Sequence, residues 1–453
     1  KTVVEEDAEV RAGGTDGDGG RVVVWSDGST DFRGTASAAA AGDGHGGLVE
    51  VSGLESLLFD GEVTTTSKSG RTGTLLLDPM DVLIADSGGE LTPAQVTNAV
   101  LGNHVVIHTN NAGRAEEGNI RVSDRIDYSS PNSLTFLAQG DMHAQASIQN
   151  SGSGELNLVA GWDGTTGAPG GTAPGPTSIT DAFDIVAIED DPEPYGTGKS
   201  HVYVGLTNDA PVVVGSLGGT TRALGHDVWV AGPPPTSEVV GAYAHLGYQR
   251  LSEDSPTIPG DIVASANGTL FVVGTGEDTH AQIGHSTTGA PMSPSGDLQL
   301  FAREGGIHIQ GGSGENSYAL VGHGGPVASG EPLNTLSGDI TVVNQSAIIG
   351  LRGGSGQNAY AQIGHGGNDY DDNMQGDIIV VPGHELIVSA GSAPLSDAHI
   401  GHGGRNVDGN LSGSITAQRY FELESEAGSA HIGHGAADGS STGDDDGIAR
   451  ADL

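Results

Sequence analysis

Apolar residues along this chain occur in short runs in which they alternate with polar residues. Such runs include residues 21–25, 270–273 and 386–388. Alternation with a period of two places apolar side chains on one face of an extended segment, so it predicts half-buried β-strands. Glycine, serine and asparagine separate the runs, and a helical period is confined to residues 92–101. The pattern therefore predicts an all-β protein.

A module of about 37 residues recurs from residue 260 onward. It opens with Gly-Asp and an apolar residue, continues through an alternating strand, and ends with an apolar residue followed by Gly-His. The openings contain Asp261, Asp297, Asp339 and Asp377, with a degenerate copy at Gly413; the endings contain His285, His323, His365, His402 and His434. Weaker copies of the ending occur at residues 224–226 and 244–247. The two signatures recur in step, which indicates a repeat array.

Each module holds three short strands and no helix. A strand-only repeat of this length is typical of a β-solenoid or a propeller, and a propeller blade needs four strands. Three strands favour one coil of a three-sided parallel β-helix, in which like residues stack about 4.8 Å apart along the axis. We therefore expect an elongated parallel β-helix.

The charge balance restricts the partners of the protein. There are 17 Lys and Arg against 58 Asp and Glu, a formal net charge of −41. Such a surface repels nucleic acids and anionic membranes, because a protein binds these partners through basic patches. No apolar run approaches the length of a membrane helix, so we expect no membrane insertion. The chain has no cysteine and does not begin with Met, and we expect Lys1 to follow from processing or trimming of a longer secreted protein.

Composition divides the chain into four regions. Residues 1–162 and residues 201–440 carry the strand pattern, the latter with the repeats. Residues 163–200 are rich in Pro, Gly and acidic residues and are expected to form a loop or a seam, because proline cannot donate to a β-ladder. Residues 441–453 are expected to be an acidic tail.

The repeated histidines are candidate metal ligands. If the modules are successive coils, His285, His323, His365, His402 and His434 form one column with rings near 5 Å apart. Imidazoles at that spacing could share Zn²⁺ or Cu²⁺. The alternative is structural: Gly-His forms a corner, and neutral stacked rings bond to loop carbonyls.

Acidic residues offer a second candidate site. Asp369, Asp371 and Asp372 form a cluster that could bind Ca²⁺ with help from backbone oxygens. The Asp residues of the Gly-Asp openings are instead expected to cap turns by accepting backbone N–H groups.

Part of the chain resembles a known family. GGRVVVWSDGSTDFRGTASA, GGLVEVSGLESLLFDGEV and GTLLLDPMDVLIA, within residues 10–162, resemble the filamentous haemagglutinin family of large secreted exoproteins. The resemblance implies a right-handed β-helix and two-partner secretion through an outer-membrane transporter.

The ends of a β-helix leave unpaired strand edges. No capping segment is evident, and residues Val3, Val4 and Val10 lie in the first expected strands. Head-to-tail contact between such ends does not close and gives a filament. The sequence therefore predicts a non-enzymatic structural subunit of an extracellular fibre or cell-surface filament. The alternatives are a rod-like adhesin segment that binds surface glycans or partner cells, and a β-helix enzyme that degrades polysaccharides.

Overall fold

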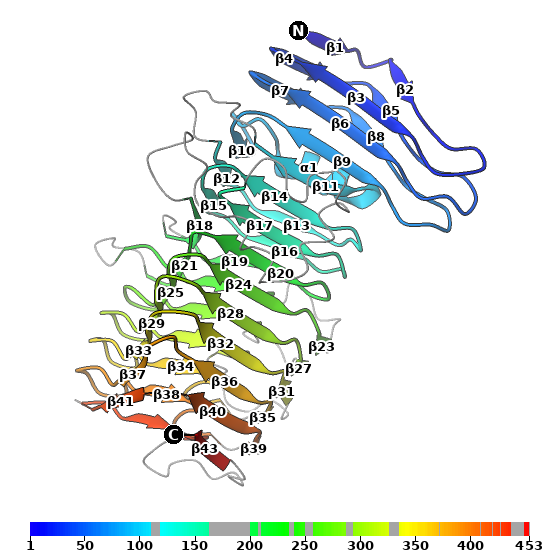
Figure 1. Cartoon of the computed structure of the whole chain (residues 1–453). Helices are drawn as coiled ribbons and strands as arrows, with labels where there is room; N and C mark the ends of the chain where they lie inside the picture. The colour runs from blue at the N-terminus through cyan, green and yellow to red at the C-terminus, as the bar shows by residue number, and fades with distance from the viewer. Residues whose placement is uncertain are drawn as a thin grey trace. The chain divides into compact units, whose positions relative to one another are not determined.

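The computed structural model describes residues 1–109, 118–162, 200–206, 210–234, 240–249, 257–286, 293–325, 335–370, 372–407, 409–418, 420–425, 427–435 and 448–452. The chain divides into two compact units, which are described separately (Figure 1). Unit 1 comprises Lys1–Ala144, Asn150–Val202 and Leu224–His226; unit 2 comprises Gln145–Gln149, Tyr203–Ala223 and Asp227–Leu453. The expected seam at residues 163–200 and tail at residues 441–453 fall mostly outside the described residues.

Unit 1 opens with three coils of three strands each. Every strand pairs in parallel with the strand at the same position of the next coil. The coils are β1 (Thr2–Val4), β2 (Glu9–Arg11), β3 (Arg21–Ser26); β4 (Ser29–Phe32), β5 (Thr35–Ser37), β6 (Leu48–Gly53); and β7 (Ser56–Phe59), β8 (Glu62–Thr64), β9 (Thr74–Asp78).

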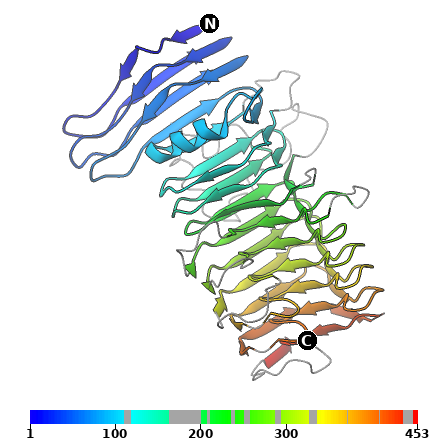
Figure 2. The same ribbon diagram turned by 180° about the vertical axis from the view of Figure 1, so that it is seen from behind.

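A helix interrupts the fourth coil of unit 1, at the position of the second strand (Figure 2). α1 (Pro93–Gly102) begins with a capping box between Thr92 and Gln95 and has Pro at its first turn. This confirms the helix predicted from the period of residues 92–101. The remaining strands of unit 1 are β10 (Val82–Ile84), β11 (His104–His108), β12 (Ile120–Val122), β13 (Ile126–Tyr128), β14 (Leu134–Ala138), β15 (Met142–Ala144) and β17 (Leu156–Ala160). The first two residues of β16 (Ile148–Asn150) belong to unit 2.

Unit 2 contains three walls of parallel strands, one for each part of the repeat. The first wall contains the strands that follow the Gly-Asp openings, β24 (Ile262–Ala266), β28 (Leu298–Ala302), β32 (Ile340–Asn344) and β36 (Ile378–Val381), and then β40 (Ser414–Gln418) and β43 (Ile448–Asp452). The second contains β21 (Asp227–Ala231), β25 (Leu270–Val273), β29 (Ile307–Gln310), β33 (Ile349–Arg352), β37 (Glu385–Ser389) and β41 (Tyr420–Glu424). The third contains β19 (Val212–Ser216), β22 (Ala244–Leu246), β26 (Ala281–Ile283), β30 (Ala319–Val321), β34 (Ala361–Ile363), β38 (Ala398–Ile400) and β42 (Ala430–Ile432).

The core of unit 2 consists of columns of identical or similar apolar residues. In the first wall, Ile262, Leu298 and Ile340 are aligned and fully buried. The apolar residue after each Gly-Asp thus points into the bore, and the alternation read from the sequence corresponds to inward and outward faces. The expected fold class, an all-β three-sided parallel β-helix, is confirmed.

Two details differ from the sequence prediction. A short fourth strand follows the third wall in several coils, and the sequence pattern did not reveal it. These strands are β23 (Thr257–Ile258), β27 (Ser293–Pro294), β31 (Thr335–Ser337), β35 (Asn373–Gln375) and β39 (Leu411–Ser412).

Residues 224–226 are not a copy of the third-wall ending, because they lie at the end of β20 (Thr221–Gly225), a strand of the sheet that contains the first wall. The copy at residues 244–247 is real, since β22 pairs with β26 in register. The remaining strand, β18 (His201–Gly205), belongs to the sheet of the second wall.

Candidate functional site

The repeated histidines form one continuous column after the third wall. From His285 through His323, His365 and His402 to His434, neighbouring ring centroids lie 5.0, 4.9, 4.8 and 4.8 Å apart, and the rings are parallel within 9°. This agrees with the stacking distance expected from the sequence. The column follows from the register of the third wall, because each histidine lies two residues after an aligned Ile or Val.

Both ring nitrogens of each column histidine are hydrogen-bonded. The backbone N–H of His285 donates to Nδ1 of His323 at 3.0 Å, and Nε2 of His323 lies 2.7 Å from the carbonyl oxygen of Gly296. The same pair of bonds recurs along the column. An Nδ1 that accepts a hydrogen bond carries no proton, so Nε2 carries it and each ring is the neutral tautomer.

Burial keeps these rings neutral over a wide pH range. It lowers the pKa of His285 and of His365 to about 4. The pKa of His323 and that of His402 also lie well below the usual value, first because of burial and then because of neighbouring histidines of the column. Desolvation dominates because a charged imidazolium would lose its hydration, and the hydrogen bond to a backbone carbonyl offsets only part of that loss.

The geometry of the column favours the structural alternative over a shared metal ion. A metal bound to an imidazole nitrogen lies in the plane of the ring, and stacked parallel planes have no common point. The lone pair of each Nδ1 is also already used by a backbone N–H. Within the described residues, no group of three or more His, Asp or Glu side chains is placed to hold a metal ion.

The Asp residues of the Gly-Asp openings form a second ladder. The Oδ1 atom of Asp297 accepts the backbone N–H of Asp339 at 2.9 Å, and Oδ1 of Asp339 accepts that of Asp377 at 2.9 Å. This confirms that these carboxylates accept backbone N–H groups, and it shows that the donor belongs to the next coil.

The expected calcium cluster stays a prediction, because the structure describes only two of its three members. Asp369 has a positive φ of 57°, and its carboxylate accepts a hydrogen bond from the Asn406 side chain at 2.8 Å. Asp372 is buried, with 7% of its surface exposed. Asp371 lies outside the described residues. Asp369 is therefore explained by its corner conformation, which Asp and Asn tolerate well.

The outer face of the third wall carries a ladder of aromatic rings that sequence reasoning missed. Tyr243, His280, Tyr318 and Tyr360 stack with centroid distances of 4.6, 4.4 and 4.9 Å. His245 lies beside this ladder, 4.6 Å from Tyr243 and 5.0 Å from His280. The last three rings of the ladder each lie five residues before a Gly-His histidine, and this fixed offset is the signal that could have revealed them.

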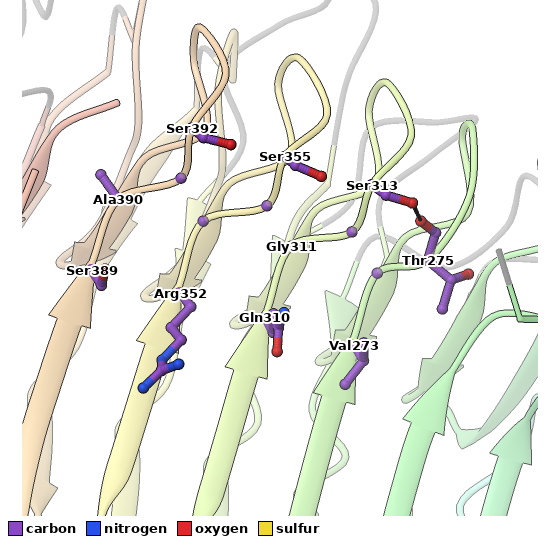
Figure 3. Close-up of a pocket in the computed structure, with 15 residues that line it drawn as sticks. Val273, Thr275, Gln310, Gly311, Ser313, Arg352, Ser355, Ser389, Ala390 and Ser392 are labelled. Atoms are coloured by element: carbon purple, nitrogen blue, oxygen red, sulfur yellow. Dashed lines mark hydrogen bonds between the residues drawn. The ribbon is translucent and has the colours of Figure 1, made fainter. Parts of the chain in front are cut away.

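Small residues line a groove along the ends of the second-wall strands (Figure 3). Its volume is about 490 Å³, and it crosses four coils from β25 to β37. Gln310 and Arg352 lie at its edge, and Ser313 and Ser355 lie on the neighbouring loops. The sequence signal for this groove is the repeated Gly-Gly-Ser at residues 311–313 and 353–355.

The residues expected to act in assembly differ in exposure. Val4 is buried and pairs with Phe32, so it belongs to the core of unit 1. Val3 and Val10 are 43% and 36% exposed, on the edge strands β1 and β2. In unit 2, the edge strand β41 exposes Phe421 and Leu423.

Comparison with known proteins gives no match for this chain among family models, curated proteins or solved structures. The resemblance to the filamentous haemagglutinin family therefore stays a prediction that depends on the quoted residues alone. Among the helices that the structure describes, none is long and apolar enough to cross a membrane.

Proposed function

We propose that this protein is a non-enzymatic structural subunit of an extracellular fibre or cell-surface filament, which assembles by strand addition at β-helix ends. The proposal includes secretion through an outer-membrane transporter and self-association as the main interaction. The observation that carries it is the exposure of apolar side chains on the edge strand β41. Phe421 and Leu423 continue the columns of Leu386 and Val388, which are fully buried, yet they are 36% and 47% exposed.

The edge strands of unit 1 offer a suitable partner surface. β1 and β2 are edge strands with exposed Val3 and Val10, and an unpaired edge is a template for another strand. The two edges differ in sequence, so strand addition between them gives a head-to-tail contact rather than a symmetric one.

Sedimentation velocity and negative-stain electron microscopy at neutral pH test this proposal. We expect the wild-type protein to form end-to-end oligomers that lengthen with concentration. Leu423→Lys should reduce assembly at least about tenfold, because it places a charge in the apolar contact. Ile379→Lys is the matched control, since Ile379 is 37% exposed on β36, away from the edge strands. Wild-type protein that remains monomeric at every concentration would refute the proposal.

The groove of Figure 3 favours a second candidate function, that of an adhesin segment that binds glycans. Gln310 and Arg352 supply planar donors, and the serine hydroxyls match the donors and acceptors of sugars. With a net charge of −41, neutral glycans are favoured over polyanionic ones. A glycan array with wild type and Arg352→Ala tests this: binding that the variant loses, without self-association of the wild type, would support the adhesin.

A further inference from the structure

Three aromatic rings are stacked on the outer face of the second wall. The ring centroids of Trp229 and Phe271 lie 3.7 Å apart, and those of Phe271 and His308 lie 5.4 Å apart. The three residues occupy aligned positions of β21, β25 and β29, and all are half-buried. Burial, and then the charge of Arg352, lower the pKa of His308. The stack therefore ends in a partly exposed imidazole that is neutral at neutral pH.

The stack stops at Gly350, the residue of β33 that is aligned with His308. Apart from its chain neighbours, a Cβ atom placed on Gly350 would have one atom within 4 Å, Nδ1 of His308 at 3.6 Å. The next aligned side chain is that of Ile387 on β37, which is two coils from His308 and therefore ~9.6 Å along the axis. Stacked rings lie ~4.5–7 Å apart, so the gap at Gly350 has room for one more ring against His308.

Arg352 lies beside this gap, two residues after Gly350 on the same face of β33. Its side chain is exposed, and within the part of the chain that the structure describes its guanidinium forms no ion pair and no hydrogen bond. In Figure 3 this side chain extends away from the glycine loops, back along its strand. Arg405, by contrast, is bound to Asp397 through hydrogen bonds of 2.7 and 3.1 Å. The donors of Arg352 are thus available to a ligand.

The groove next to Arg352 contributes no negative charge. None of its 15 lining residues is acidic, although 58 of the 453 residues of the chain are Asp or Glu. Along the column of Arg352, the first carboxylate is that of Glu424, which is aligned with Ser389. It lies two coils from Arg352, ~9.6 Å along the axis, which exceeds the Debye length of ~8 Å at physiological ionic strength. A single anionic group at Arg352 is therefore attracted, whereas a long polyanion would extend over acidic surface.

Polar side chains surround Arg352 on the groove side. Gln310 and Ser389 lie one coil before and one coil after it in the same column. Ser355 and Ser392 line the groove on the loops that follow. Within the described residues, the side chains of these four form no hydrogen bond with the protein. Their amide and hydroxyl groups are therefore free to bind the hydroxyl groups of a sugar.

We propose that this edge of the groove binds an acidic sugar, with its carboxylate on the guanidinium of Arg352 and its ring against His308, over Gly350. A guanidinium binds a carboxylate through two parallel hydrogen bonds, which neutral sugars cannot form. Gln310 and Ser389 bind the hydroxyl groups, and the neighbouring sugars of the glycan lie in the groove. The proposal rests on glycan binding, the second candidate function, and names the class of glycan: one carboxylate in the bound segment.

Calorimetric titration of the 453-residue protein with two pairs of ligands at neutral pH tests the site. The first pair is 3′-sialyllactose and lactose, and the second is the unsulfated hyaluronan disaccharide and N,N′-diacetylchitobiose. The first member of each pair has one carboxylate and the second is neutral. In at least one pair we expect the acidic ligand to bind about tenfold more tightly or better, because charged hydrogen bonds are the stronger ones. The pair that shows this preference distinguishes sialic acid from glucuronic acid.

Two variants test the assigned roles. Arg352→Gln should abolish the preference for the acidic ligand, and Gly350→Leu should weaken binding about tenfold or more by filling the gap. Gly350 does not have a positive φ, so its strand accepts a side chain. Arg121→Gln, at an exposed arginine of β12 in unit 1, is the matched control and should bind as the wild type does. Thermal unfolding of each variant shows whether it folds.

Equal binding of the acidic and the neutral ligand in both pairs would overturn this proposal and leave glycan binding intact. A preference that persists in Arg352→Gln would also overturn it, because the carboxylate would then bind elsewhere. Absence of binding by all four ligands would overturn it too, and the glycan array then decides whether the second candidate function stands. None of these measurements depends on self-association, so the fibre proposal is tested separately.

Discussion

The backbone N–H of His285 donates a 3.0 Å hydrogen bond to Nδ1 of His323, one coil further along the β-helix. The bond links side chain to backbone between coils, in addition to the strand ladders. It also requires that the ring be unprotonated at Nδ1, because a protonated nitrogen cannot accept. The column therefore couples the stability of unit 2 to pH.

The first prediction is that acidification destabilises unit 2. The folded-state pKa values of His285 and His365 are about 4, below the unfolded value of about 6.5. Between these values the unfolded chain binds more protons, so the free energy of unfolding falls as pH falls, by up to ~1.4 kcal/mol per pH unit for each such histidine. Urea unfolding followed from neutral pH to about pH 4 measures the slope. A wild-type stability that stays level across this range would contradict the expectation.

The second prediction concerns the column itself. His323→Ala removes an acceptor for the His285 N–H and a donor for the Gly296 carbonyl, and it leaves a cavity in a site with no exposed surface. We expect a loss of roughly 3–5 kcal/mol in the free energy of unfolding, measured in urea at neutral pH. His384→Ala, at an exposed ring, should cost less than about 0.5 kcal/mol. Equal losses in the two variants would show that the column bonds contribute nothing.

The third prediction concerns the close approach of successive coils. Gly364 has a φ of 151°, and a Cβ atom there would lie 1.8 Å from the carbonyl oxygen of Gly401. Gly364→Ala should therefore destabilise the protein by more than about 2 kcal/mol, through strain and displaced backbone. Gly17 has no atom within 4 Å of its Cβ position, and Gly17→Ala should lie within about 1 kcal/mol of wild type. A thermal scan of both variants is sufficient, and a normal Gly364→Ala melting curve would be evidence against this coil spacing.

The fourth prediction distinguishes two effects of the Asp339 carboxylate on stability: its oxygen accepts a hydrogen bond, and its negative charge repels neighbouring carboxylates. Asp339→Asn keeps an oxygen for the Asp377 N–H and removes repulsion between exposed carboxylates, so its stability should equal or slightly exceed that of wild type at low salt. Asp339→Ala removes the acceptor and should cost about 1 kcal/mol. Equilibrium unfolding of the two variants at low and high salt compares these effects. The reverse order of stability would show that the charge, rather than the hydrogen bond, matters.

Local patterns made the fold predictable. The alternation at residues 270–273 describes the two faces of a strand, and the capping residues Thr92 and Gln95 describe a helix start. The regular recurrence of Gly-His then implied the column, because aligned coils place equal positions above one another. The short strands of residues 335–337 and 373–375 were missed because three or fewer residues show no period.

The sequence by itself determined the walls of the β-helix, the bore residues and the histidine column. Each follows from the two-residue alternation within a strand, from the recurrence of the module, and from the constant distance between successive coils. Only the tertiary structure decided which histidine ring nitrogens have hydrogen-bond partners. His245 and His323 are both buried histidines, and only the surrounding backbone shows that one has lost its hydrogen-bond partners while the other has two. These hydrogen bonds depend on atoms that different coils bring together, so the sequence does not show whether the ring nitrogens of a given histidine are hydrogen-bonded.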